Sequence, residues 1–363
     1  MSMQRVAQLA GVSTSTVSRV FHDDPCVAAD TAAAVRQVVR QLGFSPSPRR
    51  RRNGTNGKHH STGNVIAFLV LGTSGSNATP GFEKLLRGVS DAANANDLSL
   101  ILSFVSDPAH IPTRLLEREL AGVLCHGDQP GAAGLARLRS LPSVWLMANR
   151  HRPRWGDQVM PNNAVIGDMA GRYLVRQGHR KLAYLGIGLD GWSMRLRSFA
   201  FGKAAEDAGA EAHVFEAPAG HANDYWGADG LTSAAQTLVE QVLATTPMPT
   251  GLFVAEDRSL PAIDRALRAR GIRPGTDVEI VACTNEQPHY AGLVALPARI
   301  DIRPEAIGRR GVEQLLWRMR NGDVRERVRV MVDPVLIEPE TNGTHLWRES
   351  ADGRSVEVGL TPA

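Results

Sequence analysis

The 363-residue sequence has few cysteines and no long apolar run. The three cysteines, Cys26, Cys125 and Cys283, lie far apart and lack the spacing of metal ligands, so we expect reduced thiols of a cytoplasmic protein. No apolar stretch is long enough to span a bilayer, and the first residues do not resemble a secretion signal. A membrane protein and a disulfide-stabilised secreted protein are therefore not expected.

The motifs of common enzymes are also missing. There is no Gly-rich phosphate loop, no nucleophile elbow, and no His/Cys/Asp cluster with metal-ligand spacing. The adjacent His59 and His60 lie in polar sequence and are more typical of flexible chain than of a ligand pair. The sequence therefore predicts a protein that is not an enzyme and needs no metal or cofactor.

Charge is distributed unevenly along the chain. Residues 1–60 contain nine Lys/Arg and three Asp, a net charge of +6, whereas the remainder carries 32 Lys/Arg and 34 Asp/Glu, a net charge of −2. A basic head on a near-neutral body is typical of a nucleic-acid-binding module joined to another domain, although a solvated basic tail has the same charge. The length predicts two or three domains.

Two short helices are predicted at residues 4–10 and 15–21, on either side of a turn at Gly11. The apolar residues that give each helix one buried face are Val6, Leu9, Ala10, Val17 and Val20. Glycine adopts the positive φ that such a turn needs, and the hydroxyl of Ser13 can cap the second helix. A third helix is predicted to begin at Asp30, as its cap, and to end before residue 43.

Three short helices within residues 1–45 predict a helix-turn-helix DNA-binding domain, whose second helix enters the major groove. The side chains presented there are Thr14, Ser15, Thr16, Ser18 and Arg19. Hydroxyl groups can bind phosphates or base edges, and arginine can bind guanine through two hydrogen bonds. The same helix spacing also fits a small protein-binding bundle.

The rest of the chain alternates between apolar segments and amphipathic helices. Strands are predicted at 65–71, 98–104, 122–125, 144–147, 181–186, 252–255 and 279–283, and helices at 82–94, 166–176, 197–208, 231–243 and 260–270. This alternation favours an α/β fold over residues 63–338, with two doubly wound lobes of parallel sheet covered by helices. Residues 46–62 are predicted to form an Arg-rich hinge linker, and the polar residues 339–363 a disordered tail.

Several stretches resemble the LacI/GalR family of bacterial transcriptional regulators: VAQLAGVS at 6–13, TVSRV at 16–20, GFSP at 43–46 and GHRKLAYL at 178–185. The resemblance runs from about residue 4 to about residue 338. It implies a helix-turn-helix headpiece followed by a two-lobed sensor like a periplasmic sugar-binding protein. It also implies a homodimeric repressor that binds a palindromic operator in double-stranded DNA under the control of a small polar effector, such as a sugar.

The hinge departs from the family pattern. The family has a helix there whose leucine enters the minor groove, whereas this chain has an arginine run, Arg49, Arg50, Arg51 and Arg52. These arginines are predicted to lie along phosphates or in a narrow minor groove, although a flexible charged tether is an equal alternative. His22 stands where the family usually has asparagine, and we include it among the predicted DNA contacts.

Effector contacts are expected after the carboxyl ends of the strands, where doubly wound sheets bind ligands. The candidates are Ser76, Phe82, His126, Asn149, Ser193, Arg197, Trp226, Glu256, Asp257 and Asn285. The resemblance places the family's effector-binding arginine at Arg197. The alternatives are that single candidates are ordinary loop residues, that Trp226 is a core residue, and that Arg197 pairs with Glu256 or Asp257 and holds the lobes together.

The sensor also departs from the family at paired acidic residues. Asn149-Arg150, Glu256-Asp257 and Thr284-Asn285 stand where the family often has Asp-Arg, Asn-Asp and Asp-Asp. These changes weaken a sugar assignment and leave a sugar derivative or a nucleoside open. Two alternative functions remain: a regulator that no longer responds to an effector, and a periplasmic-type ligand-binding protein without a DNA function. The helix-turn-helix head argues against the latter.

Overall fold

A computed structural model describes residues 3–21, 27–42, 64–72, 79–147, 155–187, 191–217, 228–339, 345–349 and 355–359. The chain divides into two compact units, Met1–His60 and Ser61–Ala363. Within these described ranges, no helix is both long enough and apolar enough to cross a membrane.

The described part of the first unit holds three helices, α1 (Met3–Leu9), α2 (Thr14–Phe21) and α3 (Ala29–Leu42). They pack around a small apolar core of Val6, Ala7, Val17, Val20 and Val35. Gly11 has φ +64° in the turn between α1 and α2. The Ser13 hydroxyl accepts a hydrogen bond from the backbone N–H of Thr16 at 3.1 Å, as expected for a cap.

The predicted cap of the third helix is wrong. The helix begins at Ala29, and Asp30 lies within its first turn. The backbone N–H of Ala32 already donates to the carbonyl of Ala28 at 3.0 Å, so the helical bonding starts before Asp30. An acidic side chain in the first turn still interacts favourably with the positive end of the helix.

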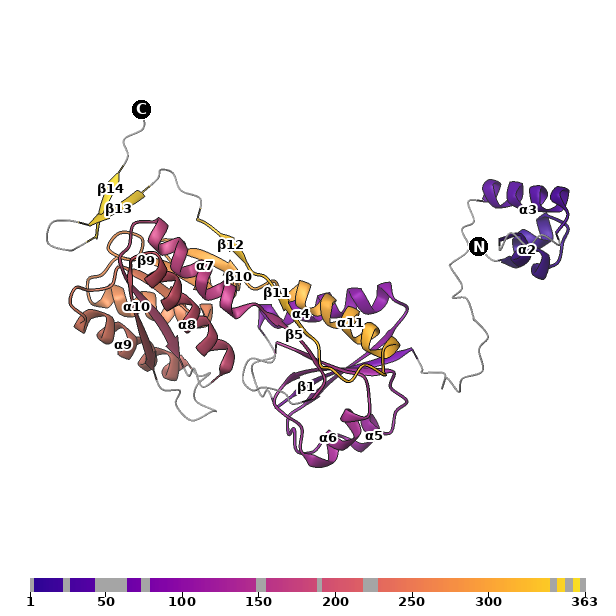
Figure 1. The fold of residues 1–363 in the computed structure, drawn as a ribbon, viewed down its shortest axis with the longest axis horizontal. Coiled ribbons are helices and arrows are strands. Elements are labelled where there is room, and N and C mark those ends of the chain that lie inside the picture. Colours follow the sequence, from indigo (N-terminus) through magenta and orange to yellow (C-terminus); the bar gives the residue numbers. More distant parts are fainter. Residues whose placement is uncertain are drawn as a thin grey trace. The chain divides into compact units, whose positions relative to one another are not determined.

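The described part of the second unit contains two six-stranded sheets, each covered by helices on both faces (Figure 1). Lobe 1 has the strand order β11-β5-β4-β3-β1-β2, with every pairing parallel. Its elements are β1 (Val65–Leu71), α4 (Pro80–Ala95), β2 (Ser99–Val105), α5 (Thr113–Leu116), β3 (Gly122–Gly127), α6 (Ala132–Arg139), β4 (Ser143–Leu146), β5 (Asp157–Pro161), α11 (Pro304–Arg320) and β11 (Arg329–Val332). One apolar cluster lies under α4 and α11, and another lies under α5 and α6 on the other face.

Lobe 2 has the strand order β12-β10-β9-β8-β6-β7. Its elements are α7 (Asn163–Arg176), β6 (Lys181–Ile187), α8 (Trp192–Asp207), β7 (Glu211–Ala217), α9 (Ala228–Ala244), β8 (Gly251–Val254), η2 (Asp257–Ser259), α10 (Leu260–Ala269), β9 (Glu279–Cys283), η3 (Gln287–Tyr290), β10 (Ala298–Asp301) and β12 (Val335–Ile337). The edge strand β12 pairs antiparallel with β10, and the other pairings are parallel. The predicted architecture of two doubly wound lobes is confirmed.

The chain passes between the lobes three times, after β5, after β10 and after β11. As a result α11 packs against α4 in lobe 1, although more than 200 residues separate them in sequence. Their contact depends on two glycines: a Cβ on Gly88 would lie 2.0 Å from the carbonyl oxygen of Glu305, and one on Gly308 would lie 2.2 Å from that of Leu85. The helix backbones therefore approach closely, as ridge-and-groove packing with small residues allows.

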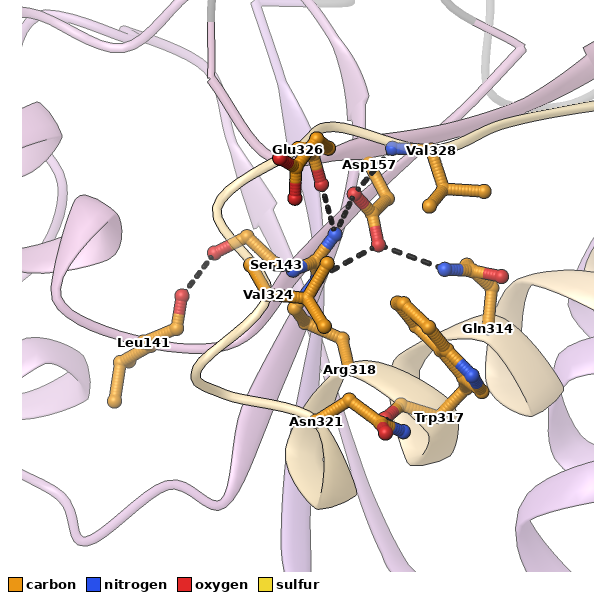
Figure 2. Close-up of polar contacts among 10 residues, drawn as sticks. All are labelled: Leu141, Ser143, Asp157, Gln314, Trp317, Arg318, Asn321, Val324, Glu326 and Val328. Atoms are coloured by element: carbon orange, nitrogen blue, oxygen red, sulfur yellow. Dashed lines mark hydrogen bonds and ion pairs between the residues drawn. The ribbon is translucent and has the colours of Figure 1, made fainter.

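A buried ion pair fastens α11 to the sheet of lobe 1 (Figure 2). Arg318 on α11 donates to both carboxylate oxygens of Asp157 on β5, at 2.7 and 2.9 Å, and the Asp157 side chain is 1% exposed. Gln314 and the backbone N–H of Val328 donate to the same carboxylate. Because Asp157 accepts four hydrogen bonds, its buried charge is compensated, and the segment leading into β11 is fixed to the lobe.

The C-terminal tail differs from its prediction. The sequence favours disorder from residue 339, whereas the structure has an antiparallel pair of strands, β13 (His345–Glu349) and β14 (Ser355–Gly359). In β14 the apolar residues Val356 and Val358 alternate with the polar Ser355 and Glu357, which is the two-residue period of a strand. The overall polarity of the tail concealed this short pattern.

Candidate DNA-binding and effector-binding sites

Helix α2 of the first unit buries one face and exposes another. Val17 is fully buried and Val20 is 3% exposed, whereas Thr14 and Arg19 are exposed. Thr16 is half-buried, and its hydroxyl lies 2.9 Å from that of Ser13. Thr14 and Arg19 thus lie on the exposed face of the helix, and Thr16 partly serves the cap.

The remaining predicted DNA contacts lie partly within α2 and partly outside the described residues. Ser15 and Ser18 lie within α2. His22 and the arginine run, Arg49, Arg50, Arg51 and Arg52, lie outside the described residues. For these positions the sequence predictions stand as predictions.

Arg197 lies on α8 in lobe 2 and is 1% exposed. Its Nε and Nη2 donate to the side-chain oxygen of Asn163, at 3.3 and 2.8 Å, and its Nη1 donates to the carbonyl of Ala255 at 2.5 Å. The alternative in which Arg197 pairs with Glu256 or Asp257 is wrong: its recorded partners in the described part of the chain are an amide and a backbone carbonyl. The guanidinium therefore joins α7 to the end of β8.

Asn163, which orients Arg197, was missed by the sequence analysis. It is the first residue of α7 and 3% exposed, and its Nδ2 donates to the carbonyl of Pro161 at 3.2 Å. It follows β5 after a single residue, the helix cap Asn162. It therefore lies after the carboxyl end of a strand, as the predicted effector contacts do. It was overlooked because the short strand Asp157–Pro161 was not predicted.

Asp257 follows β8 and is fully buried. Its carboxylate accepts a hydrogen bond from the backbone N–H of Glu286 at 2.7 Å. Burial raises the pKa of Asp257 to about 7, and this N–H and the hydroxyls of Tyr290 and Thr284 act in the opposite direction. Asp257 therefore anchors the segment that follows β9.

Asn285 lies in that segment and is 6% exposed. Its amide donates to Asp301 at 3.0 Å and accepts from Gln287 at 3.2 Å. Thr284 and Asn285 both have positive φ, +114° and +58°. A β-branched residue rarely adopts such a backbone, and conformations of this kind cluster at ligand-binding and switch segments.

The candidates of lobe 1 form an aromatic group at the start of α4. The ring of Phe82 lies 5.9 Å from that of His126 and 6.0 Å from those of Phe68 and Phe104. His126 Nδ1 lies 3.0 Å from the carbonyl oxygen of Leu146. Phe104 is 53% exposed, so this group presents an apolar surface beside polar residues.

The two groups of candidates meet where the lobes contact each other. The Nζ of Lys84 on α4 donates to the backbone carbonyl of Asn285 at 3.4 Å. Ser193 is 1% exposed at the start of α8, one turn before Arg197, and Glu256 is half-buried directly after β8. Ser76, Asn149 and Trp226 lie outside the described residues.

Within the described segments, no three His, Cys, Asp or Glu side chains are grouped closely enough to hold a metal ion.

Comparison with known proteins gives two family matches. Residues 2–47 match the family described as bacterial regulatory proteins, lacI family, and residues 172–341 match the periplasmic binding protein-like domain. Together the matched regions cover more than half of the chain. They correspond to the helix-turn-helix unit and to most of lobe 2 with the return to lobe 1.

Individual relatives align over almost the whole chain. The ribose operon repressor of Escherichia coli (strain K12) is 25% identical over 349 residues, which are 93% of this chain and 98% of that protein. A transcriptional regulator CelR–cellobiose complex is similar with a TM-score of 0.61 and 23% identity, and covers 93% of this chain and 98% of its own. The lac repressor dimer bound to operator and the anti-inducer ONPF has a TM-score of 0.59 and 19% identity, with the same coverage.

In this chain a helix-turn-helix unit comes first, followed by two parallel-sheet lobes with α11 returning to lobe 1. Both family matches and the alignment over the full length agree with this order. The resemblance seen in the sequence is therefore confirmed, and the chain belongs to the LacI/GalR family of bacterial transcriptional regulators.

Proposed function

We propose that this chain is a DNA-binding transcriptional repressor that binds a palindromic operator as a homodimer and responds to a small polar effector. The observation that carries the proposal is the exposed face of α2, with Thr14 and Arg19, on a helix whose opposite face is buried. Such a helix docks in the major groove, and the basic charge of residues 1–60 supports binding to phosphates.

A selection from random DNA duplexes tests the DNA function with the full chain. A regulator of this type enriches a two-fold symmetric sequence, since each protomer of a dimer binds one half-site. Arg19→Ala should weaken binding to the selected sequence by about 1–3 kcal/mol, because a bidentate contact to a base contributes that amount. Arg36→Ala on α3, also exposed, is the control and should change binding less.

Equal loss of affinity for selected and random duplexes in Arg19→Ala would show that Arg19 binds the DNA backbone and not a base. Enrichment of no sequence at all would contradict the repressor function itself.

Sedimentation of the full chain tests the assembly. A single headpiece contacts few bases, so two must act together for tight, specific binding. The relatives include the lac repressor, described as a dimer bound to operator. A chain that remains monomeric at micromolar concentration would contradict the homodimer.

The effector is proposed to bind where the two lobes meet, between Phe82 and His126 of lobe 1 and the segment around Arg197 and Asn285 of lobe 2. Polar groups that donate and accept hydrogen bonds, beside an aromatic group, suit a sugar, a sugar derivative or a nucleoside. Among the similar structures, CelR is a cellobiose complex. Thermal unfolding of the full chain with such compounds tests this, because a ligand of the folded state raises the transition temperature.

A further inference from the structure

The carboxylate of Glu286 in lobe 2 lies directly against the start of α4 in lobe 1. Gly81, the second residue of α4, is buried, and a Cβ on it would lie 2.4 Å from Oε1 of Glu286. A side chain at position 81 would therefore displace the Glu286 carboxylate from this place. The Glu286 side chain is 14% exposed, so it is largely enclosed.

The start of α4 attracts a negative charge. The helix has 16 residues, and the Thr79 hydroxyl caps it by accepting from the N–H of Phe82 at 3.1 Å. The aligned peptide dipoles give the start of a helix a partial positive charge, which stabilises a nearby carboxylate. Lys84, one turn further on, donates to the carbonyl of Asn285, so two neighbouring groups of lobe 2 face positive groups of α4.

Lobe 2 holds Glu286 in this position by contacts of its own. The buried Asp257 accepts from the Glu286 backbone N–H, and Asp301 accepts from Asn285. The strained backbone of Thr284 persists because these bonds surround it. His289, on the following turn, lies 3.3 Å from the Glu286 carboxylate.

We propose that Glu286 is an interlobe clasp, whose carboxylate on the start of α4 holds the lobes together and sets the equilibrium between lobe arrangements. An effector can shift such an equilibrium only by binding one arrangement better than the other. By favouring the arrangement in which the lobes are in contact, the clasp assists an effector that binds this arrangement better. It opposes an effector that binds the other arrangement better. The regulatory consequence rests on the proposed function, whereas the clasp itself is a property of the lobes alone.

Hydrogen exchange of the full chain, without DNA or ligand, tests the clasp. Glu286→Gln preserves the shape of the side chain and removes its charge. Exchange should rise in peptides covering residues 80–86 and 284–290, by between about twofold and thirtyfold, the range expected for a charge near a helix terminus. Glu240→Gln is the control, since Glu240 pairs with Arg270 at 2.6 Å on the surface of the same lobe, and both peptides should remain unchanged.

A second variant approaches the clasp from lobe 1. Gly81→Ala places a methyl group where the carboxylate lies, so it should raise exchange in both peptides. In a Glu286→Ala background the same change should have little effect, because the obstacle is gone. If the effects of Gly81→Ala and Glu286→Ala on exchange were additive, the clasp would be contradicted. The same conclusion would follow if exchange rose in residues 284–290 alone, because Glu286 would then act only within its own loop.

These outcomes are independent of the DNA selection. If the selection enriched no DNA sequence, the proposed function would be contradicted and the exchange result would be unaffected. Unchanged exchange in Glu286→Gln would remove the clasp and leave the repressor intact.

Discussion

Arg197 makes three hydrogen bonds inside lobe 2, to Asn163 and to the carbonyl of Ala255. This arrangement gives the arginine a structural role before any effector binds. We expect Arg197→Met to lower the free energy of unfolding by about 1–3 kcal/mol without ligand, because two buried acceptors lose their donors. Arg195→Met, at an exposed position of the same helix, should change it by less than about 0.5 kcal/mol.

Chemical denaturation of both variants provides the measurement. Unchanged stability in Arg197→Met, together with loss of any ligand-induced stabilisation, would instead favour a role in effector binding alone.

Asp257 makes the stability of lobe 2 depend on pH. Its pKa is raised to about 7 in the folded chain, above the unfolded value of about 3.9. The folded state therefore binds the proton more tightly, and this contribution to stability is complete below pH 4 and is lost as the pH rises to 7. Asp257→Asn keeps an acceptor for the Glu286 N–H and should remove this loss. Denaturation curves at pH 5 and pH 8 should show a gain from Asp257→Asn at pH 8 relative to pH 5.

The sequence located some site residues because each lies shortly after the end of an apolar strand. Asp257 after β8 and Asn285 after β9 are examples. The partners of these residues could not be predicted in the same way. Asn163, Gly81 and Glu286 take their roles from contacts with segments far along the chain, and sequence spacing carries no information on such contacts.

At the scale of helices, the packing of α4 on α11 depends on the absence of side chains at the contact. A methyl group on Gly308 would lie 2.2 Å from the Leu85 carbonyl oxygen, so Gly308→Ala must push the helices apart. We expect a loss of about 1–3 kcal/mol in the free energy of unfolding. Gly202→Ala on α8 is the matched control, since no atom lies within 4 Å of its added methyl group.

The control should stabilise the chain by about 0.5–1 kcal/mol, because alanine favours helix over glycine. Thermal or chemical denaturation measures both variants. Equal effects of the two substitutions would contradict the close contact between α4 and α11.

Most strands of the lobes could be predicted because their sequences are continuous apolar runs. The prediction at 65–71 coincides with β1, and that at 279–283 with β9. Five strands of the lobes were not predicted: β5 (DQVMP), β7 (EAHVFEA), β10, β11 and β12. β7 is an edge strand with alternating polar residues, and the Asp157 of β5 is polar because it receives Arg318 from α11. The fold class could thus be predicted from the alternation of apolar strands and amphipathic helices. The points at which the chain crosses between the lobes could not be predicted in this way.

At the scale of the whole molecule, positive charge is concentrated in residues 1–60, and the arginine run Arg49–Arg52 supplies four of the nine basic residues. Each phosphate that a protein neutralises contributes about 0.9 to the slope of log K against log salt concentration. If the run lies along phosphates, changing all four arginines to glutamine should reduce the slope by up to about 4. Affinities for selected and random duplexes should fall alike, because phosphates carry no base sequence.

The matched control removes positive charge from the sensor. Arg325, Arg327 and Arg329 are exposed near the end of α11 and in β11, and their replacement by glutamine should leave the salt slope nearly unchanged. This comparison separates direct contact from a general loss of charge, since the salt slope reports the phosphates that a protein neutralises and not its net charge. A full salt slope in the variant of residues 49–52 would mean that the run is a flexible tether. The phosphate contacts would then belong to the three-helix unit alone.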